Sequence, residues 1–160
     1  MKVLLRVVMV GAALVAGSAG LVRADCAVPE GAAAQEQALL GWINAEREAR
    51  GLRPYSRNAR LDRAARFHAC DMVDHNYFNH SRPGGPKLAA RIKATGYRPK
   101  SANENIAYAR HPAATTAAEI WRNSPPHWAA IIDPSFRDIG IALTSGNGKV
   151  YWVMEAARPK

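Results

Sequence analysis

Residues 139–154, IGIALTSGNGKVYWVM, decide the fold class of this chain because the spacing of apolar residues changes there. Two short runs of β-branched and aromatic residues, 139–143 and 150–154, flank the tripeptide GNG at 146–148, which is typical of a β-hairpin turn. Earlier in the chain, apolar residues instead recur every three or four positions, as in helices. Helices followed by strands favour an α+β fold, with helices packed on a small antiparallel sheet, over a doubly wound parallel fold.

Five segments before this hairpin have helical patterns. Two prolines at 125–126 separate the last two of these segments, since proline is tolerated in the first turn of a helix but not in its interior. Thr116 and Glu119 match a capping box near the start of the fourth. The loop NHSRPGGP, residues 79–86, holds too many prolines and glycines for a helix. The expected helices cover approximately residues 36–50, 58–76, 88–95, 115–123 and 126–132.

The start of the chain resembles an export signal. Lys2 and Arg6 precede an apolar run over residues 7–22, and Val22-Arg23-Ala24 fits the rule for signal-peptidase cleavage after Ala24. An uncleaved membrane anchor is the alternative, although the run is shorter than the roughly 20 apolar residues of a spanning helix. We therefore expect a signal peptide at 1–24, a flexible segment at 25–36 and one domain at 37–160, secreted to a periplasm or the extracellular space.

The charge of the chain is basic but spread out. Its formal net charge is +9, and loss of the three basic residues of the leader leaves about +6. The remaining basic residues form no stripe interleaved with aromatic residues, so nucleic-acid binding is not expected. A mild attraction to anionic cell-wall polymers or phospholipid headgroups fits the charge better. Nothing in the sequence predicts self-association, and a monomer is expected.

Two cysteines, Cys26 and Cys70, remain after removal of the leader. In an oxidising compartment they are expected to form a disulfide, which would attach the new N-terminus to an interior segment. Closing such a long loop would stabilise the fold by about 2–4 kcal/mol. The alternative is that Cys70 is a small buried residue and Cys26 a free thiol.

The motifs of the common enzyme classes are absent: no nucleophile elbow, no HExxH zinc motif, no phosphate loop and no dinucleotide fingerprint. Four polar residues nevertheless stand where local structure does not require them, namely His80, Glu104, Glu119 and His127. Each has an ordinary explanation when taken alone, as a capping residue or a surface histidine. Three other histidines, His68, His75 and His111, have no predicted role. His68 and His75 lie on the second expected helix, where they fit a solvent-exposed side of that helix.

Several short motifs follow one another in an order that resembles a known family. They are Asn44-Ala-Glu-Arg47 with Gly51-Leu-Arg-Pro54, Cys70-Asp-Met72, Tyr77-Phe-Asn-His80, Asn103-Glu-Asn-Ile106, Glu119-Ile-Trp121, Asn123-Ser-Pro-Pro-His127 and Tyr151-Trp-Val153. Each motif is weak alone, but in this order the set resembles the CAP superfamily of cysteine-rich secretory proteins, antigen 5 and pathogenesis-related proteins. The resemblance departs from the usual family pattern at Arg57, Asn103 and Pro126.

The resemblance implies a three-layer α-β-α sandwich with a cleft lined by two histidines and two acids. In this sequence those residues are His80, Glu104, Glu119 and His127. Neutral imidazoles bind zinc-like divalent ions, so His80 and His127 are the candidate metal ligands. Carboxylates orient such ligands or accept protons, so Glu104 and Glu119 are the candidate catalytic residues of a hydrolase.

Three functions fit these expectations. The first is a secreted module whose cleft binds a lipid, a cell-envelope component or a protein. The second is a metal-assisted hydrolase that acts on peptide or cell-envelope amide bonds. The third is a domain in which the polar residues only stabilise the fold. The resemblance favours the first, because a shared fold does not fix a reaction.

Overall fold

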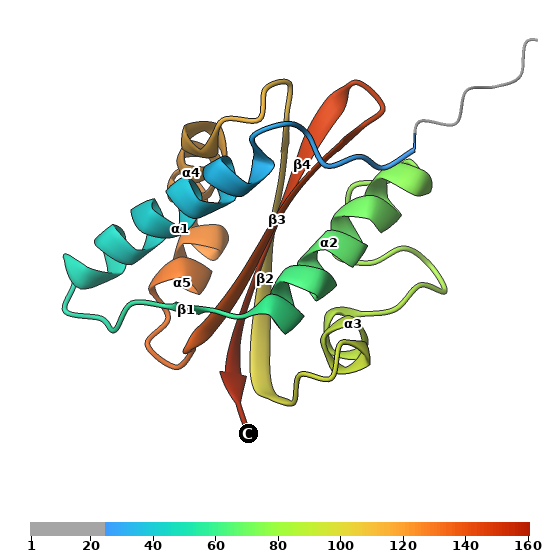
Figure 1. Ribbon diagram of the computed structural model, residues 1–160. Helices are drawn as coiled ribbons and strands as arrows, with labels where there is room; N and C mark the ends of the chain where they lie inside the picture. The colour runs from blue at the N-terminus through green and yellow to red at the C-terminus, as the bar shows by residue number, and fades with distance from the viewer. Residues whose placement is uncertain (1–24) are drawn as a thin grey trace, which may run out of the picture.

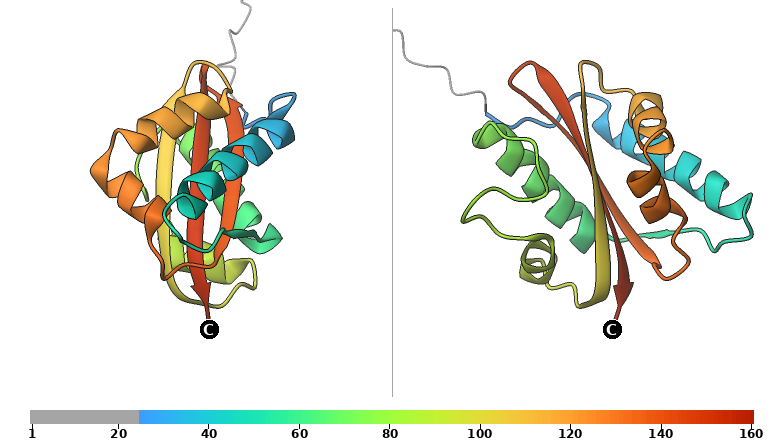
Figure 2. Two further views of the ribbon diagram at one scale, coloured as in Figure 1. Left: turned by 90° about the vertical axis from the view of Figure 1, so that its left-hand side faces the viewer. Right: turned by 180° about the vertical axis from the view of Figure 1, so that it is seen from behind.

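The structure is a computed structural model that describes residues 25–160, so the predicted signal peptide at 1–24 lies outside the described residues. A four-stranded sheet, with the strand order β1-β3-β4-β2, forms the middle layer. Helices α1 (Ala32–Glu48), α4 (Ala114–Arg122) and α5 (Pro125–Ile132) cover one face, and α2 (Ala59–Asp74) and α3 (Leu88–Ala94) cover the other (Figure 1). The views in Figure 2 show the same three layers from the side and from behind. The predicted α+β sandwich is confirmed.

The predicted hairpin consists of β3 (Asp138–Gly146) and β4 (Lys149–Pro159), which pair antiparallel. Both turn residues have positive φ angles, 53° at Asn147 and 70° at Gly148, which match the right-handed twist of the strands. The short strand β1 (Ser56–Arg57) pairs parallel with β3, so the sheet is mixed at that edge rather than purely antiparallel.

The strand β2 (Pro99–Ala109) pairs antiparallel with β4 and is not predicted by the sequence pattern. Its first half is polar and carries Asn103, Glu104 and Asn105 in place of an alternating apolar pattern. These residues form a strand because β4 supplies a partner along the whole length of β2. The strand that the pattern misses is also the one that carries a predicted site residue.

The core lies on both faces of the sheet, and alternate residues of β4 contribute to each. Trp152 and Met154 pack among residues of α1, α4 and α5, whereas Tyr151 and Val153 pack against α2. On β3, a side chain at Gly140 would lie 2.1 Å from the backbone of Leu61, so glycine lets α2 approach the sheet closely.

The helix boundaries are close to those expected, with two differences. α1 begins at Ala32, inside the segment predicted to be flexible, which is also attached through the pairing of Ala27 with Ser145. The predicted capping box at Thr116 and Glu119 is wrong, because α4 already begins at Ala114. None of the helices in residues 25–160 combines the length and apolar character needed to cross a membrane.

The predicted disulfide between Cys26 and Cys70 is confirmed. It attaches the N-terminal segment to α2 across a sequence separation of 44 residues. A closed loop of that length lowers the conformational entropy of the unfolded chain. In the chain-entropy account, this stabilises the fold by about 4 kcal/mol.

Candidate functional site

The structure brings three of the four predicted site residues to the outer edge of β2. Glu104 lies on β2 itself, His80 lies in the loop between α2 and α3, and His127 lies in the first turn of α5. Because β2 is an edge strand, the two histidines reach it from the two different helix layers. We call His80, Glu104 and His127 the two-histidine site.

His80 is held through its ring by Glu104. Its Nδ1 lies 2.8 Å from Glu104 Oε1, and the side chain of His80 is 54% exposed while that of Glu104 is 2% exposed. A carboxylate can only accept, so Nδ1 carries the proton and Nε2 carries the lone pair. The hydrogen bond to Glu104 raises the pKa of His80, against the opposing effect of partial burial. His80 is thus an exposed imidazole with a fixed orientation.

His127 is less accessible and less basic. Pro125 and Pro126 occupy the first turn of α5, as the sequence predicted, and place His127 beside them. Burial lowers the pKa of His127, and the positive charge of a protonated His80 lowers it further, which puts the two rings within electrostatic reach. Among residues 25–160, the Nδ1 atom of His127 is buried without a hydrogen-bond partner. The lowered pKa favours the neutral imidazole, which is the form of histidine that can bind a ligand or a metal ion.

Asn105 holds His127 from the opposite side of the strand. The side chain of Asn105 is buried and donates from Nδ2 to the carbonyl oxygen of His127, at 2.9 Å. Successive residues of a strand point to opposite faces, so Glu104 faces α2 and α3 while Asn105 faces α5. The dipeptide Glu104-Asn105 therefore contacts both histidines.

Arg91, on α3, holds the loop that carries His80. Its Nη1 atom donates to the carbonyl oxygens of His80, at 3.1 Å, and Pro86, at 2.9 Å. Its Nη2 atom pairs with the carboxylate of Glu104. Arg91 and its contact with Glu104 are buried, whereas its bonds to the two loop carbonyls are partly buried.

A second carboxyl group, that of Glu155, lies beside the ion pair of Arg91 and Glu104. Glu155 is opposite Glu104 in the register of β2 and β4, is fully buried, and lies 3.9 Å from Arg91 Nε through its Oε1 atom. Burial raises the pKa of Glu155 well above its ordinary value; Glu104 raises it further, and Arg91 opposes both. Two carboxylates directly opposite each other repel, so retaining a proton on Glu155 relieves the conflict.

His68 is buried beside the same pair, and its interpretation as part of a solvent-exposed side of the helix is wrong. Its side chain is 1% exposed, and Nε2 lies 3.6 Å from Glu104 Oε1. Burial lowers the pKa of His68, and the opposing effect of Glu104 does not outweigh it. A signal existed in the sequence, since His68 lies three positions after Ala65 and four before Met72 on the buried stripe of α2.

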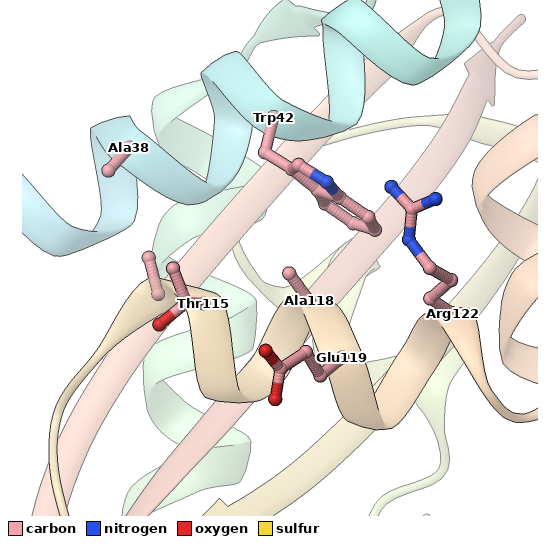
Figure 3. A pocket seen from close by; sticks show the side chains of 7 residues that line it. Ala38, Trp42, Thr115, Ala118, Glu119 and Arg122 are labelled. Carbon is pink, nitrogen blue, oxygen red and sulfur yellow. The ribbon is translucent and has the colours of Figure 1, made fainter.

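Glu119 does not join the two-histidine site. It lines a pocket of about 300 Å³ between α1 and α4 together with Trp42 and Arg122 (Figure 3). Trp121, two positions along α4, is buried and donates to the carbonyl oxygen of Ile106 on β2, so Glu119 projects from the opposite side of the helix. In the described part of the chain, Glu119 makes no hydrogen bond or ion pair with His80, Glu104 or His127.

The site offers two histidine side chains, His80 and His127, as candidate metal ligands. Within residues 25–160, no group of three or more histidine, cysteine, aspartate or glutamate side chains is arranged to hold a metal ion. This donor set is smaller than that of a closed structural zinc site, which has four protein ligands. The residues that the sequence analysis missed are the supporting ones: His68, Arg91, Asn105 and Glu155.

Comparisons with known proteins agree with this architecture. The sequence is 34% identical over 113 residues to the uncharacterized protein YkwD of Bacillus subtilis (strain 168), covering 71% of this chain and 44% of that protein. The chain thus spans less than half the length of this relative. An extracellular protein containing a SCP domain from Bacillus anthracis str. Ames has a similar structure, with a TM-score of 0.73 and 24% identity over 79% of this chain and 41% of the other.

Two further solved structures share the fold at lower identity. An outer surface protein from Borrelia burgdorferi has a TM-score of 0.73 and 19% identity over 79% of this chain and 94% of its own. The crystal structure of NaASP2 with Zn²⁺ has a TM-score of 0.58 and 14% identity, covering 81% of this chain and 83% of its own. Finally, residues 40–155 match the family described as CAP, the cysteine-rich secretory protein family. This chain belongs to the CAP family.

Proposed function

We propose that this protein is a secreted binding module whose two-histidine site takes a divalent, zinc-like metal and, through it, a component of the cell envelope. One observation carries the proposal: His80 is more than half exposed, yet its ring is fixed by a carboxylate that is almost fully buried. A surface histidine without a function has no need of such a partner. Carboxylate support of this kind is typical of histidines that bind metals.

The two histidines suit a metal for complementary reasons. His80 has its proton on Nδ1 and offers the lone pair of Nε2, whereas His127 has a lowered pKa and a buried nitrogen without a partner among the described residues. The lowered pKa of His127 favours the neutral form that binds metals, whereas the raised pKa of His80 means that a metal ion competes with a proton for its Nε2 atom. When bound, a zinc-like ion would supply a Lewis acid that attracts an anionic or carbonyl oxygen of the ligand. The fold relative NaASP2, solved with Zn²⁺, supports this choice of ion.

Binding is favoured over hydrolysis because neither of the two predicted catalytic acids is placed as a free base. Glu104 accepts from His80 through one carboxylate oxygen and from Arg91 through the other. Glu119 lines the pocket between α1 and α4 instead. A metal-assisted hydrolase needs a carboxylate or histidine that can reach the attacking water, and both predicted acids are otherwise placed. Loss of turnover on an envelope substrate in Glu104→Gln would contradict this preference.

Secretion rests on three supports of different kinds. The first 24 residues resemble a signal peptide, the disulfide suits an oxidising compartment, and relatives of the same fold are described as extracellular or outer-surface proteins. An envelope ligand rich in phosphate or carboxylate groups would also suit the basic net charge of the chain.

The deciding experiment is a zinc titration of the protein purified after export from a bacterial host. Calorimetry and thermal unfolding are followed in wild type, in the His80→Ala/His127→Ala double variant, and in His111→Ala, an exposed histidine outside the site, as the matched control. We expect saturable binding and a raised melting temperature in wild type and in the control, and neither in the double variant. Absence of binding in wild type would refute the metal proposal.

A further inference from the structure

We propose that Arg91 and Asn105 are the positioning residues of the two-histidine site, and that together with β2 they set the separation of the two imidazoles. This inference rests on the proposed function, since it concerns the same two rings. It assigns a purpose to residues that touch no ligand and that lie outside the predicted set of histidines and acids. Its basis is the way each histidine is fixed to the edge strand.

The His80 side of the site depends on Arg91. The loop between α2 and α3 has no regular secondary structure and contains two glycines and two prolines. Arg91 contacts this loop near both ends, through the carbonyl oxygens of His80 and Pro86, and reaches Glu104 with its other terminal nitrogen. His80 is therefore held twice by the same buried pair, through its backbone by Arg91 and through its ring by Glu104. The planar guanidinium makes all these contacts at once, which a lysine ammonium cannot do.

The His127 side depends on Asn105. α5 is short and begins with Pro125 and Pro126, which have no backbone N–H, and no side chain caps its start. The bond from Asn105 to the carbonyl oxygen of His127 therefore gives this turn a fixed point on the sheet. The side chain of Asn105 is buried and the bond is partly buried, so water competes with it less than at the surface.

The two supports meet in one rigid element. Glu104 and Asn105 are consecutive residues of a strand that is paired on its inner side with β4. The distance between the histidines is therefore set by the width of one strand and by two buried side chains, not only by the loop and the short helix that carry the rings. Substituting residues that hold metal-binding histidines in place typically weakens metal affinity by about 10–100-fold.

The test measures zinc affinity together with local opening in the full exported protein. Arg91→Lys keeps the positive charge but loses the two terminal nitrogens of the guanidinium that bind the loop and Glu104. Asn105→Leu keeps the size of the side chain but loses the Nδ2 donor. The matched controls are Arg57→Lys, in the ion pairs with Glu36 and Asp62, and Asn44→Leu, which removes a side chain bonded to the backbone of Tyr55. If Asn105→Leu does not fold, Asn105→Thr replaces it, because the threonine side chain is too short for its hydroxyl to reach the carbonyl oxygen of His127.

We expect zinc to bind about tenfold more weakly, or worse, in both site variants and with wild-type affinity in the controls. Amide hydrogen exchange provides a readout that needs no metal. It should accelerate at the hydrogen-bonded amide of Gly85 in Arg91→Lys and at that of Trp128, the hydrogen-bonded amide that follows the two prolines of α5, in Asn105→Leu. Exchange elsewhere should match the controls. Wild-type affinity and wild-type exchange in the site variants would overturn the inference.

The two proposals fail in distinguishable ways. If wild type binds zinc and the site variants bind it equally well, the positioning role is wrong and the proposed function stands. If wild type binds no zinc, the proposed function is wrong, and local exchange alone decides the positioning role. Uniformly faster exchange over the whole domain would show a general loss of stability and would also overturn the positioning role.

Discussion

The two edges of the sheet are both crossed by buried charges, yet they differ in how completely those charges are satisfied. At the β3 edge, Glu36 accepts from the backbone N–H of Leu143 at 3.0 Å, from Arg66 at 2.7 Å and from Arg57 at 2.6 Å. At the β2 edge, buried side-chain atoms without hydrogen-bond partners among the described residues lie on His68, Arg91, His127 and Glu155, while Thr144 of β3 and Trp152 of β4 carry one such atom each. Most of the unpaired buried atoms of the described residues therefore gather at the β2 edge.

The difference indicates what each edge is for. Side chains at the β3 edge occupy backbone groups that would otherwise be free to pair with another chain, which protects an exposed edge strand. Unsatisfied buried groups cost stability and are retained mainly where a function needs them. The incomplete bonding at β2 therefore supports a functional site there, independently of the family to which the chain belongs.

The largest effect is expected from breaking the ion pairs at the β3 edge. Glu36→Ala removes the only carboxylate partner of Arg66 among the described residues, leaves Arg57 with Asp62 alone, and leaves the N–H of Leu143 without a partner. The free energy of unfolding should therefore fall by about 3 kcal/mol in urea denaturation. Glu46→Ala is the matched control, because Glu46 also pairs with two arginines. Those arginine side chains are 40% and 47% exposed, against 28% and 34% for the partners of Glu36.

The control should lose no more than about 1 kcal/mol, as is usual for exposed pairs. Zinc affinity should be the same in wild type and in Glu36→Ala. Equal losses of stability in the two variants, or a loss of zinc binding in Glu36→Ala, would remove the distinction between the two edges.

A smaller, pH-dependent effect is expected at the β2 edge. Because the pKa of folded Glu155 is raised well above its ordinary value of 4.5, the unfolded chain releases this proton first as pH rises. The group therefore lowers wild-type stability above pH 4.5, by at most about 1.4 kcal/mol per pH unit, until the folded carboxyl also ionises.

Glu155→Gln removes this penalty. In urea denaturation from pH 4 to pH 8, the stability of the variant relative to wild type should rise with pH. Glu104 and Arg91 face Glu155 in both proteins, so their own titration largely cancels in the difference. A difference that stays constant with pH would show that Glu155 ionises normally.

The smallest effect separates the two histidines. The pKa of His80 is raised by its bond to Glu104, and the pKa of His127 is lowered by burial and by His80. In an NMR titration of the ring protons, His80 should therefore protonate at a higher pH than His127. Glu104→Gln should move the midpoint of His80 downward. A reversed order in wild type would contradict the assigned geometry.

The same shifts fix the sign of two opposing contributions to stability. His80 adds to the free energy of unfolding below its unfolded pKa of about 6.5, and this gain is lost as pH rises through its raised pKa in the folded protein. His127 adds to the free energy of unfolding above a pH of about 6.5, and this gain is lost as pH falls through its lowered pKa in the folded protein. The two contributions change in opposite directions with pH, which is why individual titrations are the sharper measurement.

Features set by neighbouring residues could be predicted from the sequence. The turn at Asn147 and Gly148 follows from residues that tolerate positive φ, and the start of α5 follows from its two prolines. The disulfide follows from the presence of only two cysteines in the chain. The α+β layering follows from the order of helical and strand-like segments, each of which shows its own periodicity.

The composition of the site depended on tertiary structure. β2 is a strand because β4 pairs with it, and its register with β4 places Glu155 opposite Glu104. Glu119 is excluded from the site because α4 turns Trp121 toward the sheet, a rotation that its own sequence left undecided. Local patterns depend on residues a few positions apart, whereas pairing, helix rotation and burial depend on which distant segments meet. The sequence by itself therefore determined the helices and the β3–β4 hairpin and pointed to the two histidines, and only the packing of distant segments decided that β2 is a strand and which side chains support the histidines.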